Sequence, residues 1–131
     1  MRIVLNIDVP ALDPAIAFYT TAFGLTLSRI IDEDVAELKG ASYVIYLLAK
    51  AAESTVGTGA KETRRYTRHW TPIHPDFVVK DIAAFATQVM NAGAIQESEC
   101  IDWKGSKCLT FSDPFGHGFC LIEFKNETYE D

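Results

Sequence analysis

The sequence lacks several features that would place the protein in a specialised class. It has no apolar run long enough to cross a bilayer, and its first residues alternate like a strand where a signal peptide would have a continuous apolar segment. Only three cysteines occur, Cys100, Cys108 and Cys120, and no two of them form a C-x-x-C pair. An odd set of this kind is typical of reduced proteins. We therefore expect a cytoplasmic protein with free thiols and no membrane partner.

A surplus of positive charge is also absent. The chain carries 12 Lys+Arg against 18 Asp+Glu, which gives a formal net charge of −6. Proteins that bind a phosphate backbone use net basic surfaces, so we expect no nucleic-acid partner. What the chain does have is 48% hydrophobic residues over 131 positions. This content is sufficient for a hydrophobic core and excludes an intrinsically disordered chain.

The first part of the chain predicts the element order β-α-β-β-β. Residues 2–9 alternate between apolar and other side chains, as expected of a strand with one covered face. Asp13 as the N-cap, Pro14 at the first helical position and Gly24 after the last turn then predict a helix. Three strand-like runs follow, over residues 25–31, 35–39 and 43–49.

The same order returns in the second part of the chain. Residues 74–79 predict a strand, and residues 81–93 predict a helix that ends at Gly93. Three further strand-like runs cover residues 94–101, 107–112 and 118–124. We therefore expect one domain over residues 1–131, organised as a first module (1–50), a connector (51–72), a second module (73–125) and a C-terminal tail (126–131).

Two local motifs add to this repeat. Ala17-Phe18-Tyr19 lies shortly before Phe23-Gly24-Leu25, and residues 113–120 read Asp-Pro-Phe-Gly-His-Gly-Phe-Cys at the final hairpin. In this order the motifs resemble the vicinal oxygen chelate superfamily, which contains glyoxalases, bleomycin resistance proteins and extradiol dioxygenases. The resemblance implies an α+β, glyoxalase-like fold, in which two β-α-β-β-β modules form a curved mixed sheet or half-barrel around a cleft. It also implies a homodimer.

Enzymes of this superfamily hold a divalent metal with four positions, on the first and last strand of each module. The resemblance places these positions at Val4, Tyr46, His74 and Cys120. Valine has no donor atom, and a tyrosine with an ordinary pKa near 10 is a poor ligand. We therefore expect no conventional metal site and no cofactor.

Three cysteine and histidine residues leave one metal alternative open. Cys108 and Cys120 flank the last hairpin, and together with His74 they would supply three zinc-capable ligands. The competing interpretation is that the two cysteines are buried and act as small hydrophobic side chains.

The predicted binding residues are polar and aromatic side chains on the cleft face. His74 is the candidate catalytic residue, because imidazole exchanges protons near neutral pH. Phe111 and Phe124 are either further aromatic walls or core residues, and the arginines of the connector either close over an anion or remain solvated. The candidate ligand-binding residues are Asn6, Tyr46, His74, Asp76, Trp103 and Cys120.

Three functions are compatible with the sequence. The leading prediction is a protein similar to the bleomycin resistance branch, which binds a small molecule in its cleft without the divalent metal. The second is a lactoylglutathione-lyase-like or dioxygenase-like enzyme with a rebuilt or metal-free active site. The third is an oligomeric interaction module without a cleft wide enough for a guest.

Overall fold

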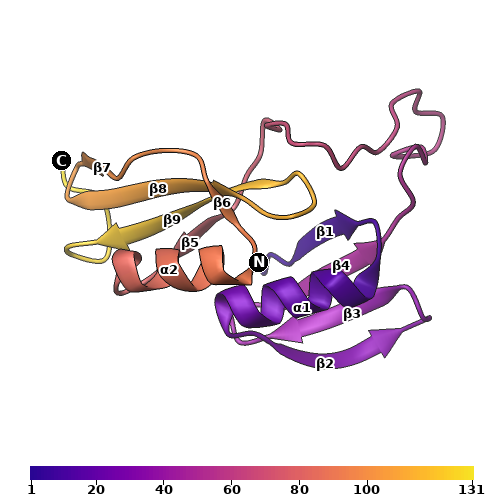
Figure 1. Ribbon diagram of the computed structural model, residues 1–131, viewed down its shortest axis with the longest axis horizontal. Helices are drawn as coiled ribbons and strands as arrows, with labels where there is room; N and C mark the ends of the chain where they lie inside the picture. Colours follow the sequence, from indigo (N-terminus) through magenta and orange to yellow (C-terminus); the bar gives the residue numbers. More distant parts are fainter. The chain divides into compact units, whose positions relative to one another are not determined.

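The computed structural model describes all residues, 1–131, as two compact units. The first unit contains residues 1–67 and the second contains residues 68–131. Figure 1 shows the first in indigo to magenta and the second in red to yellow. The boundary falls within the segment that the sequence pattern assigns to the connector. Neither helix of the structure has the length and apolar character that crossing a membrane requires.

The first unit is a four-stranded sheet with one helix. Its strands follow the order β1-β4-β3-β2, in which β1 and β4 are parallel and the other neighbours are antiparallel. The predicted β-α-β-β-β order is confirmed for this unit. Its elements are β1 (Leu5–Val9), α1 (Leu12–Phe23), β2 (Thr26–Ile31), β3 (Val35–Lys39) and β4 (Ile45–Ala49).

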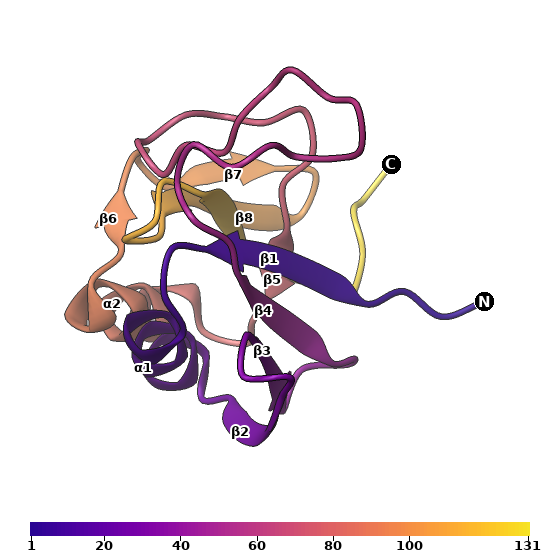
Figure 2. The same ribbon diagram turned by 90° about the vertical axis from the view of Figure 1, so that its right-hand side faces the viewer.

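The core of the first unit lies between α1 and one face of this sheet, and Figure 2 shows α1 on one side of strands β1, β3 and β4. Val9, Leu38 and Leu47 are fully buried there, and Phe18 and Tyr19 of α1 are buried with them. Each such side chain contributes about 1.5–3 kcal/mol through burial. Because side chains alternate along a strand, the opposite face carries the remaining residues of β1, β3 and β4. We call this opposite face the far face.

Helix α1 begins earlier than predicted. Its N-cap is Ala11, with an extended backbone and no capping hydrogen bond from a side chain, so the assignment of Asp13 as the N-cap was wrong. Pro14 then lies in the first turn instead of at the first helical position. It is tolerated there because the first four backbone nitrogens of a helix have no partner within the helix. The predicted end is confirmed, since Gly24 adopts the left-handed conformation with φ 65°.

The second unit repeats this plan with one additional strand. Its sheet has the order β5-β9-β8-β6, with β5 and β9 parallel, and β7 also pairs with β8. The predicted repeat of the β-α-β-β-β order is therefore confirmed, apart from a break in one strand. The elements are β5 (Asp76–Val78), α2 (Ile82–Ala92), β6 (Ile95–Gln96), β7 (Ile101–Trp103), β8 (Ser106–Ser112) and β9 (Gly118–Phe124).

Two predicted strands of the second unit differ from the structure. The run over residues 94–101 is broken into β6 and β7, because the side chain of Ser98 accepts the backbone N–H of Thr110 and interrupts the ladder. The run over residues 74–79 is shortened to β5, so His74 precedes the strand. Pro75 lies between them and has no N–H to donate to a ladder.

Helix α2 has the cap that α1 lacks. The carboxylate of Asp81 accepts the backbone N–H of Ala84 at 3.0 Å, and the helix ends before Gly93. Ile82 and Val89 are buried, whereas Met90, which recurs with them at helical spacing in the sequence, is 40% exposed. The buried residues Ile82, Ala86 and Val89 form one stripe of α2, and Met90, one residue further around the helix than Val89, lies at its edge.

The C-terminal residues fold back onto the hairpin formed by β7 and β8. Lys104 and Gly105 form its turn, both with positive φ, as a tight hairpin turn requires. The backbone N–H of Glu130 donates to the carbonyl of Lys104 at 2.7 Å. The ring of Tyr129 packs edge-on against Trp103 and Phe124. The tail therefore anchors this end of the sheet.

Candidate functional site

A row of side chains crosses the face of the second sheet that is opposite α2, which we likewise call the far face. Asp76 of β5 pairs with Cys120 of β9, and Cys120 pairs in turn with Thr110 of β8. Residues paired in this way point to the same side of a sheet. Phe111 and Leu121 belong to the other face, beside α2, and are fully buried, so Phe111 is a core residue and does not line a binding surface.

Three side chains of different chemistry meet in this row. One donor atom from each of His74, Asp76 and Cys120 lies within 4.8 Å of the others. The Nε2 atom of His74 and the Oδ1 atom of Asp76 are 3.3 Å apart, and both side chains are 40% exposed. Cys120 is buried, with its thiol 3.6 Å from the hydroxyl of Thr110. We call these three residues the triad cluster.

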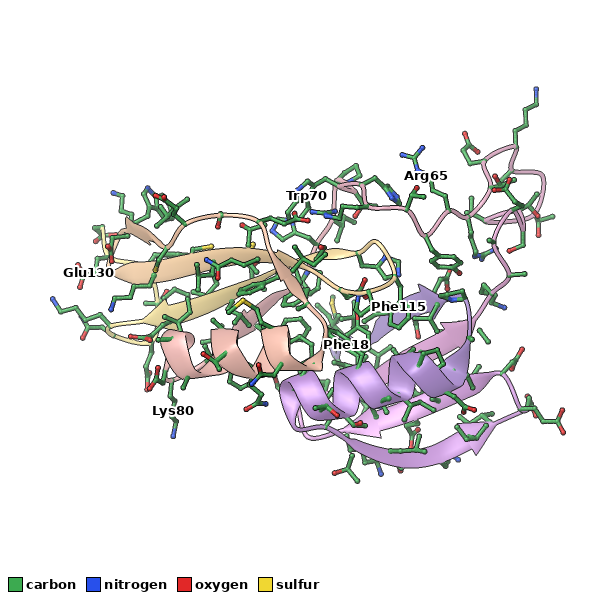
Figure 3. All side chains as sticks on the ribbon, in the orientation of Figure 1. Phe18, Arg65, Trp70, Lys80, Phe115 and Glu130 are labelled. Atoms are coloured by element: carbon green, nitrogen blue, oxygen red, sulfur yellow. The ribbon has the colours of Figure 1, made fainter.

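Trp70 packs beside the triad cluster. Its ring makes an edge-on contact with the ring of His74, with 5.0 Å between centroids. The guanidinium of Arg68 lies over Trp70 at 4.6 Å and also pairs with Glu97. Figure 3 labels Trp70 on the segment that leads to β5. The indole therefore forms a partly exposed aromatic wall next to the two polar side chains of the cluster.

The contact between Trp70 and the sheet depends on Gly118. A Cβ atom at Gly118 would lie 2.7 Å from the Trp70 ring, closer than real contacts allow. The glycine therefore lets the indole pack directly on the backbone of β9. Neither residue was predicted from the sequence, since nothing in the local pattern links position 70 to position 118. The glycine in an apolar strand was the one available signal, because it often marks such a close approach.

The thiols of this region are not activated. Burial raises the pKa of Cys120, and the hydrogen bond between Cys120 and Thr110 opposes that shift only in part. Burial, with the neighbouring Cys120 as the next cause, raises the pKa of Cys108 to about 12. Both groups are therefore protonated near neutral pH in the metal-free protein. A thiol in that state is a poor nucleophile, so the site does not favour covalent catalysis by cysteine.

The first unit has a corresponding row with different contents. Asn6 pairs with Tyr46, Tyr46 pairs with Glu37, and Glu37 pairs with Arg29. Arg29 donates two hydrogen bonds of 3.2 Å to the carboxylate of Glu37. The hydroxyl of Tyr46 donates to the same carboxylate at 3.0 Å. Glu37 is 5% exposed, so these bonds satisfy a buried charge.

These bonds determine what Tyr46 can do. The hydrogen bond from Arg29 lowers the pKa of Glu37, and the hydrogen bond to Glu37 raises the pKa of Tyr46. The Tyr46 hydroxyl is therefore held as a neutral donor. Val4, the other position of this unit, has no donor atom at all. The two positions that the family resemblance assigns to the first unit therefore supply no ready ligand for a divalent ion.

The structure separates the predicted binding residues into three places. His74, Asp76 and Cys120 come together, whereas Asn6 and Tyr46 lie in the row of the first unit. Cys108 lies beside Cys120 but is not a member of the triad cluster. Trp103 pairs with Ser106, about 13 Å along β8 from Thr110, and borders a separate open cavity of about 480 Å³.

Glu37 and Arg29 were not predicted from the sequence either. A single charged residue between apolar neighbours in β3 was the available signal, since charged residues are rarely buried unless paired. Recognising its partners required the register of three strands. Two of the connector arginines have partners as well, because Arg64 pairs with Asp8 at 2.7 Å and Arg68 pairs with Glu97. Arg65 is exposed, and Figure 3 labels it.

Known proteins share this fold. A family model described as "Glyoxalase-like domain" matches residues 4–122. The structure is similar to that of the fosfomycin resistance protein FosX from Listeria monocytogenes, with a TM-score of 0.74 and 15% identity over 97% of this chain and 93% of that chain. It is also similar to lactoylglutathione lyase from Agrobacterium tumefaciens, with a TM-score of 0.67 and 17% identity over 98% and 97% of the respective chains.

A glyoxalase-related enzyme from Fulvimarina pelagi shares the architecture too, with a TM-score of 0.72 and 15% identity over 94% of this chain and 87% of that chain. At these identities the structural similarities establish a common fold and nothing finer. A comparison with curated protein sequences gives no significant match.

Proposed function

The chain belongs to the glyoxalase-like domain family, within the vicinal oxygen chelate superfamily, and on that premise we propose that it binds a small organic molecule on the far face of its second unit. The binding residues are Trp70 and the polar members of the triad cluster. No divalent ion at the four metal positions of the superfamily takes part. In the cell the protein would sequester a drug or metabolite.

One observation supports this function above all others. The Trp70 indole is 47% exposed and packs on Gly118, directly beside the polar pair of His74 and Asp76. Binding sites for small molecules combine such an aromatic wall with a few polar groups that set orientation. A planar guest stacked on the indole gains about 0.5–1.5 kcal/mol beyond its buried area. His74 and Asp76 then form hydrogen bonds with its polar edge.

The names of two structural neighbours support a small organic guest. One is a fosfomycin resistance protein, and another is named a glyoxalase/bleomycin resistance protein/dioxygenase family enzyme from Burkholderia phytofirmans. The proposal takes from them only the class of guest, a small organic molecule. It uses neither Asn6, Tyr46 nor Trp103, which lie outside the triad cluster.

Tryptophan fluorescence tests this proposal directly. The sequence contains two tryptophans, so the Trp103→Phe variant leaves Trp70 as the only one. In that background, a panel of planar drug-like compounds and metabolites is screened for quenching of Trp70. For a compound that binds, Trp70→Ala should weaken the affinity of the otherwise unmodified protein at least about tenfold, because the stacking surface is removed.

Two controls complete the test. Tyr46→Phe should change the affinity by less than about twofold, because Tyr46 lies in the other row. Binding should also persist after exhaustive treatment with a chelator. An affinity that is indifferent to Trp70, or that disappears with the chelator, would show the proposal to be wrong.

A second candidate is a lyase or isomerase, supported by the 3.3 Å contact between His74 and Asp76. A carboxylate orients an imidazole for proton transfer in this way. The assay follows the formation of lactoylglutathione, the compound named by one structural neighbour. His74→Ala should then lower the rate by about 10²-fold or more. An unchanged rate would exclude proton transfer by His74.

The proposal also includes the assembly implied by the family resemblance. The two units together form one domain, and two chains form a homodimer. Sedimentation equilibrium measures the mass in solution, and a monomer over the whole accessible concentration range would contradict the dimer.

A further inference from the structure

A cavity opens at one end of the second unit, around the turn between β7 and β8. Its volume is about 480 Å³, which lies within the range of small-molecule sites in proteins. Figure 1 shows this turn beside the C-terminus. The groups that give the cavity its chemistry are the indole of Trp103, the ammonium groups of Lys104, Lys107 and Lys125, and the carboxylates of Asp102 and Glu123. We call it the lysine cavity.

The lysine cavity is separate from the triad cluster. Lys107 of β8 pairs with Glu123 of β9, three positions along each strand from the pair that contains Cys120. Because side chains alternate along a strand, Lys107 and Glu123 point to the side of the sheet that carries α2. The carboxylate of Glu123 accordingly accepts the backbone N–H of Ile82, at the start of that helix, at 2.7 Å. No member of the triad cluster lines the cavity.

The charges around the cavity favour an anion. Lys104 and Lys107 are exposed and form no ion pair within the chain, and Lys125 reaches only Glu130, at 3.9 Å. The carboxylate of Glu123 is used at the positive end of α2, where it stabilises the helix start instead of a lysine. Ammonium groups that share one space repel one another, and an anion bound between them replaces this repulsion with attraction.

Trp103 adds an apolar wall to this basic cavity. Its indole is 57% exposed and contacts the ring of Tyr129 edge-on, with 5.1 Å between centroids. A planar guest can contact the indole while its charged group accepts hydrogen bonds from the lysines, and such charge-assisted bonds are stronger than neutral ones. From these observations we infer that the lysine cavity is a second binding site, which takes a planar organic anion of the aromatic carboxylate class.

This inference goes beyond the proposed function, because it concerns a different guest at a different place. The two sites can be distinguished, since each contains one of the two tryptophans of the chain. Trp70 reports on the far face, and Trp103 reports on the lysine cavity. The indole N–H groups give two separate signals in a proton–nitrogen NMR spectrum, and the Trp103→Phe variant identifies which signal belongs to which residue.

Titration with naphthalene-2-carboxylate tests the inference. Calorimetry should give saturable binding of one molecule per chain, and the probe should shift the indole signal of Trp103. The neutral naphthalene-2-carboxamide has the same ring system without the charge, so it should bind at least about tenfold more weakly. Added salt should weaken binding of the carboxylate, because ions screen the exposed lysines.

Two variants with opposite expected effects sharpen the test. Lys107→Gln removes a positive charge and should weaken binding of the carboxylate at least about fivefold. Asp102→Asn, at the position paired with Lys107, removes a negative charge and should strengthen binding by about two- to fivefold. Both alter exposed side chains, and circular dichroism confirms that each variant folds. Lys39→Gln, in the first unit, changes the net charge equally and should alter the affinity by less than about twofold.

Several outcomes would overturn the inference. They are the absence of saturable binding, equal binding of the carboxylate and the carboxamide, and a shift of the Trp70 signal alone. An equal loss in Lys39→Gln and Lys107→Gln would overturn it as well, because binding would then follow net charge only. Opposite signs for Lys107→Gln and Asp102→Asn would replace it with a cation site. Trp70→Ala should change the affinity for the probe by less than about twofold, so this inference and the proposed function fail separately.

Discussion

The two units place equivalent rows of residues on equivalent strands and fill them in opposite ways. In the first unit, Arg29 and Tyr46 both donate hydrogen bonds to Glu37. We call this the closed row, because its polar groups are used in bonds to one another. In the second unit, Cys120 and Thr110 occupy the positions of Tyr46 and Glu37. Beside these shorter side chains, His74 and Asp76 pair with each other and remain partly exposed.

The comparison shows how a repeated backbone supports different chemistry. Register fixes which positions meet, because paired residues of neighbouring strands share one side of the sheet. Side-chain length and charge then decide whether these positions bond to each other or present donors to a ligand. The side chains of this row in the first unit therefore bond to one another, whereas the corresponding row in the second unit is a candidate binding site.

The largest expected effect tests what the two units have in common. Leu47 pairs with Ile7 and Leu121 pairs with Phe77, and both leucines are fully buried. Leu47→Ala and Leu121→Ala should each lower the free energy of unfolding by about 2–5 kcal/mol. Urea denaturation measures this loss. If the units form one cooperative domain, both variants shift the same single transition. Two transitions, each sensitive to one variant, would mean that the units fold independently.

The next effect concerns the aromatic wall of the second unit. Gly118→Ala places a methyl group 2.7 Å from the ring of Trp70, so the indole must move. We expect a loss of about 1–3 kcal/mol in unfolding free energy, as for other overpacked sites. Trp70 fluorescence in the Trp103→Phe background should shift to longer wavelength. An unshifted spectrum would show that the indole does not pack on β9.

A smaller effect distinguishes the two helices. Asp81 caps α2 through its side chain, whereas Asp13 of α1 makes no capping bond. Asp81→Ala should cost about 1 kcal/mol of stability. Asp13→Ala should cost clearly less, since it removes only a favourable charge from the first turn. Equal losses in thermal unfolding would contradict the assigned N-caps.

The smallest effect is expected in the pH dependence of the closed row. Arg29 lowers the pKa of Glu37 in the folded protein, so the ionised carboxylate stabilises the fold at neutral pH. This contribution is present above the ordinary carboxyl pKa and is lost as the pH falls through the lowered value. The Arg29 side chain is 64% exposed, and solvent screening keeps the effect small.

Chemical denaturation at several pH values measures this contribution. The stability difference between the protein and its Glu37→Gln variant should be greatest near neutral pH and should vanish in acid. Thr110→Val, at the equivalent position of the second unit, should show no such change with pH because neither residue titrates. A difference for Glu37→Gln that grows in acid would contradict the assigned shift.

Much of the secondary structure could be predicted from local patterns. The runs over residues 35–39 and 118–124 coincide with β3 and β9, and Gly24 and Gly93 follow the two helices. The errors arose where local signals compete. Asp13 has the chemistry of an N-cap, but α1 begins at Leu12. Residues 94–101 have strand composition, but the Ser98 side chain takes a ladder position.

The candidate site could be predicted only in part. The positions of His74 and Cys120 followed from the family resemblance, and that of Asp76 followed from alternation along its strand. Their proximity depends on the parallel pairing of β5 with β9. Glu37 and Arg29 were not predicted, because an ion pair between two strands cannot be inferred until the register of those strands is known. Trp70 was not predicted either, because its neighbours lie in distant parts of the sequence.

The sequence by itself therefore determined the element order, the internal repeat, the family resemblance and the absence of a donor atom at Val4. These depend on local periodicity, capping chemistry and residue type, which act over a few neighbouring positions. Only the tertiary structure decided that the Tyr46 hydroxyl donates a hydrogen bond to Glu37. It also decided that the side chains of His74 and Cys120 lie close together. Such contacts join distant segments, and strand register, which the local pattern does not specify, decides which side chains meet.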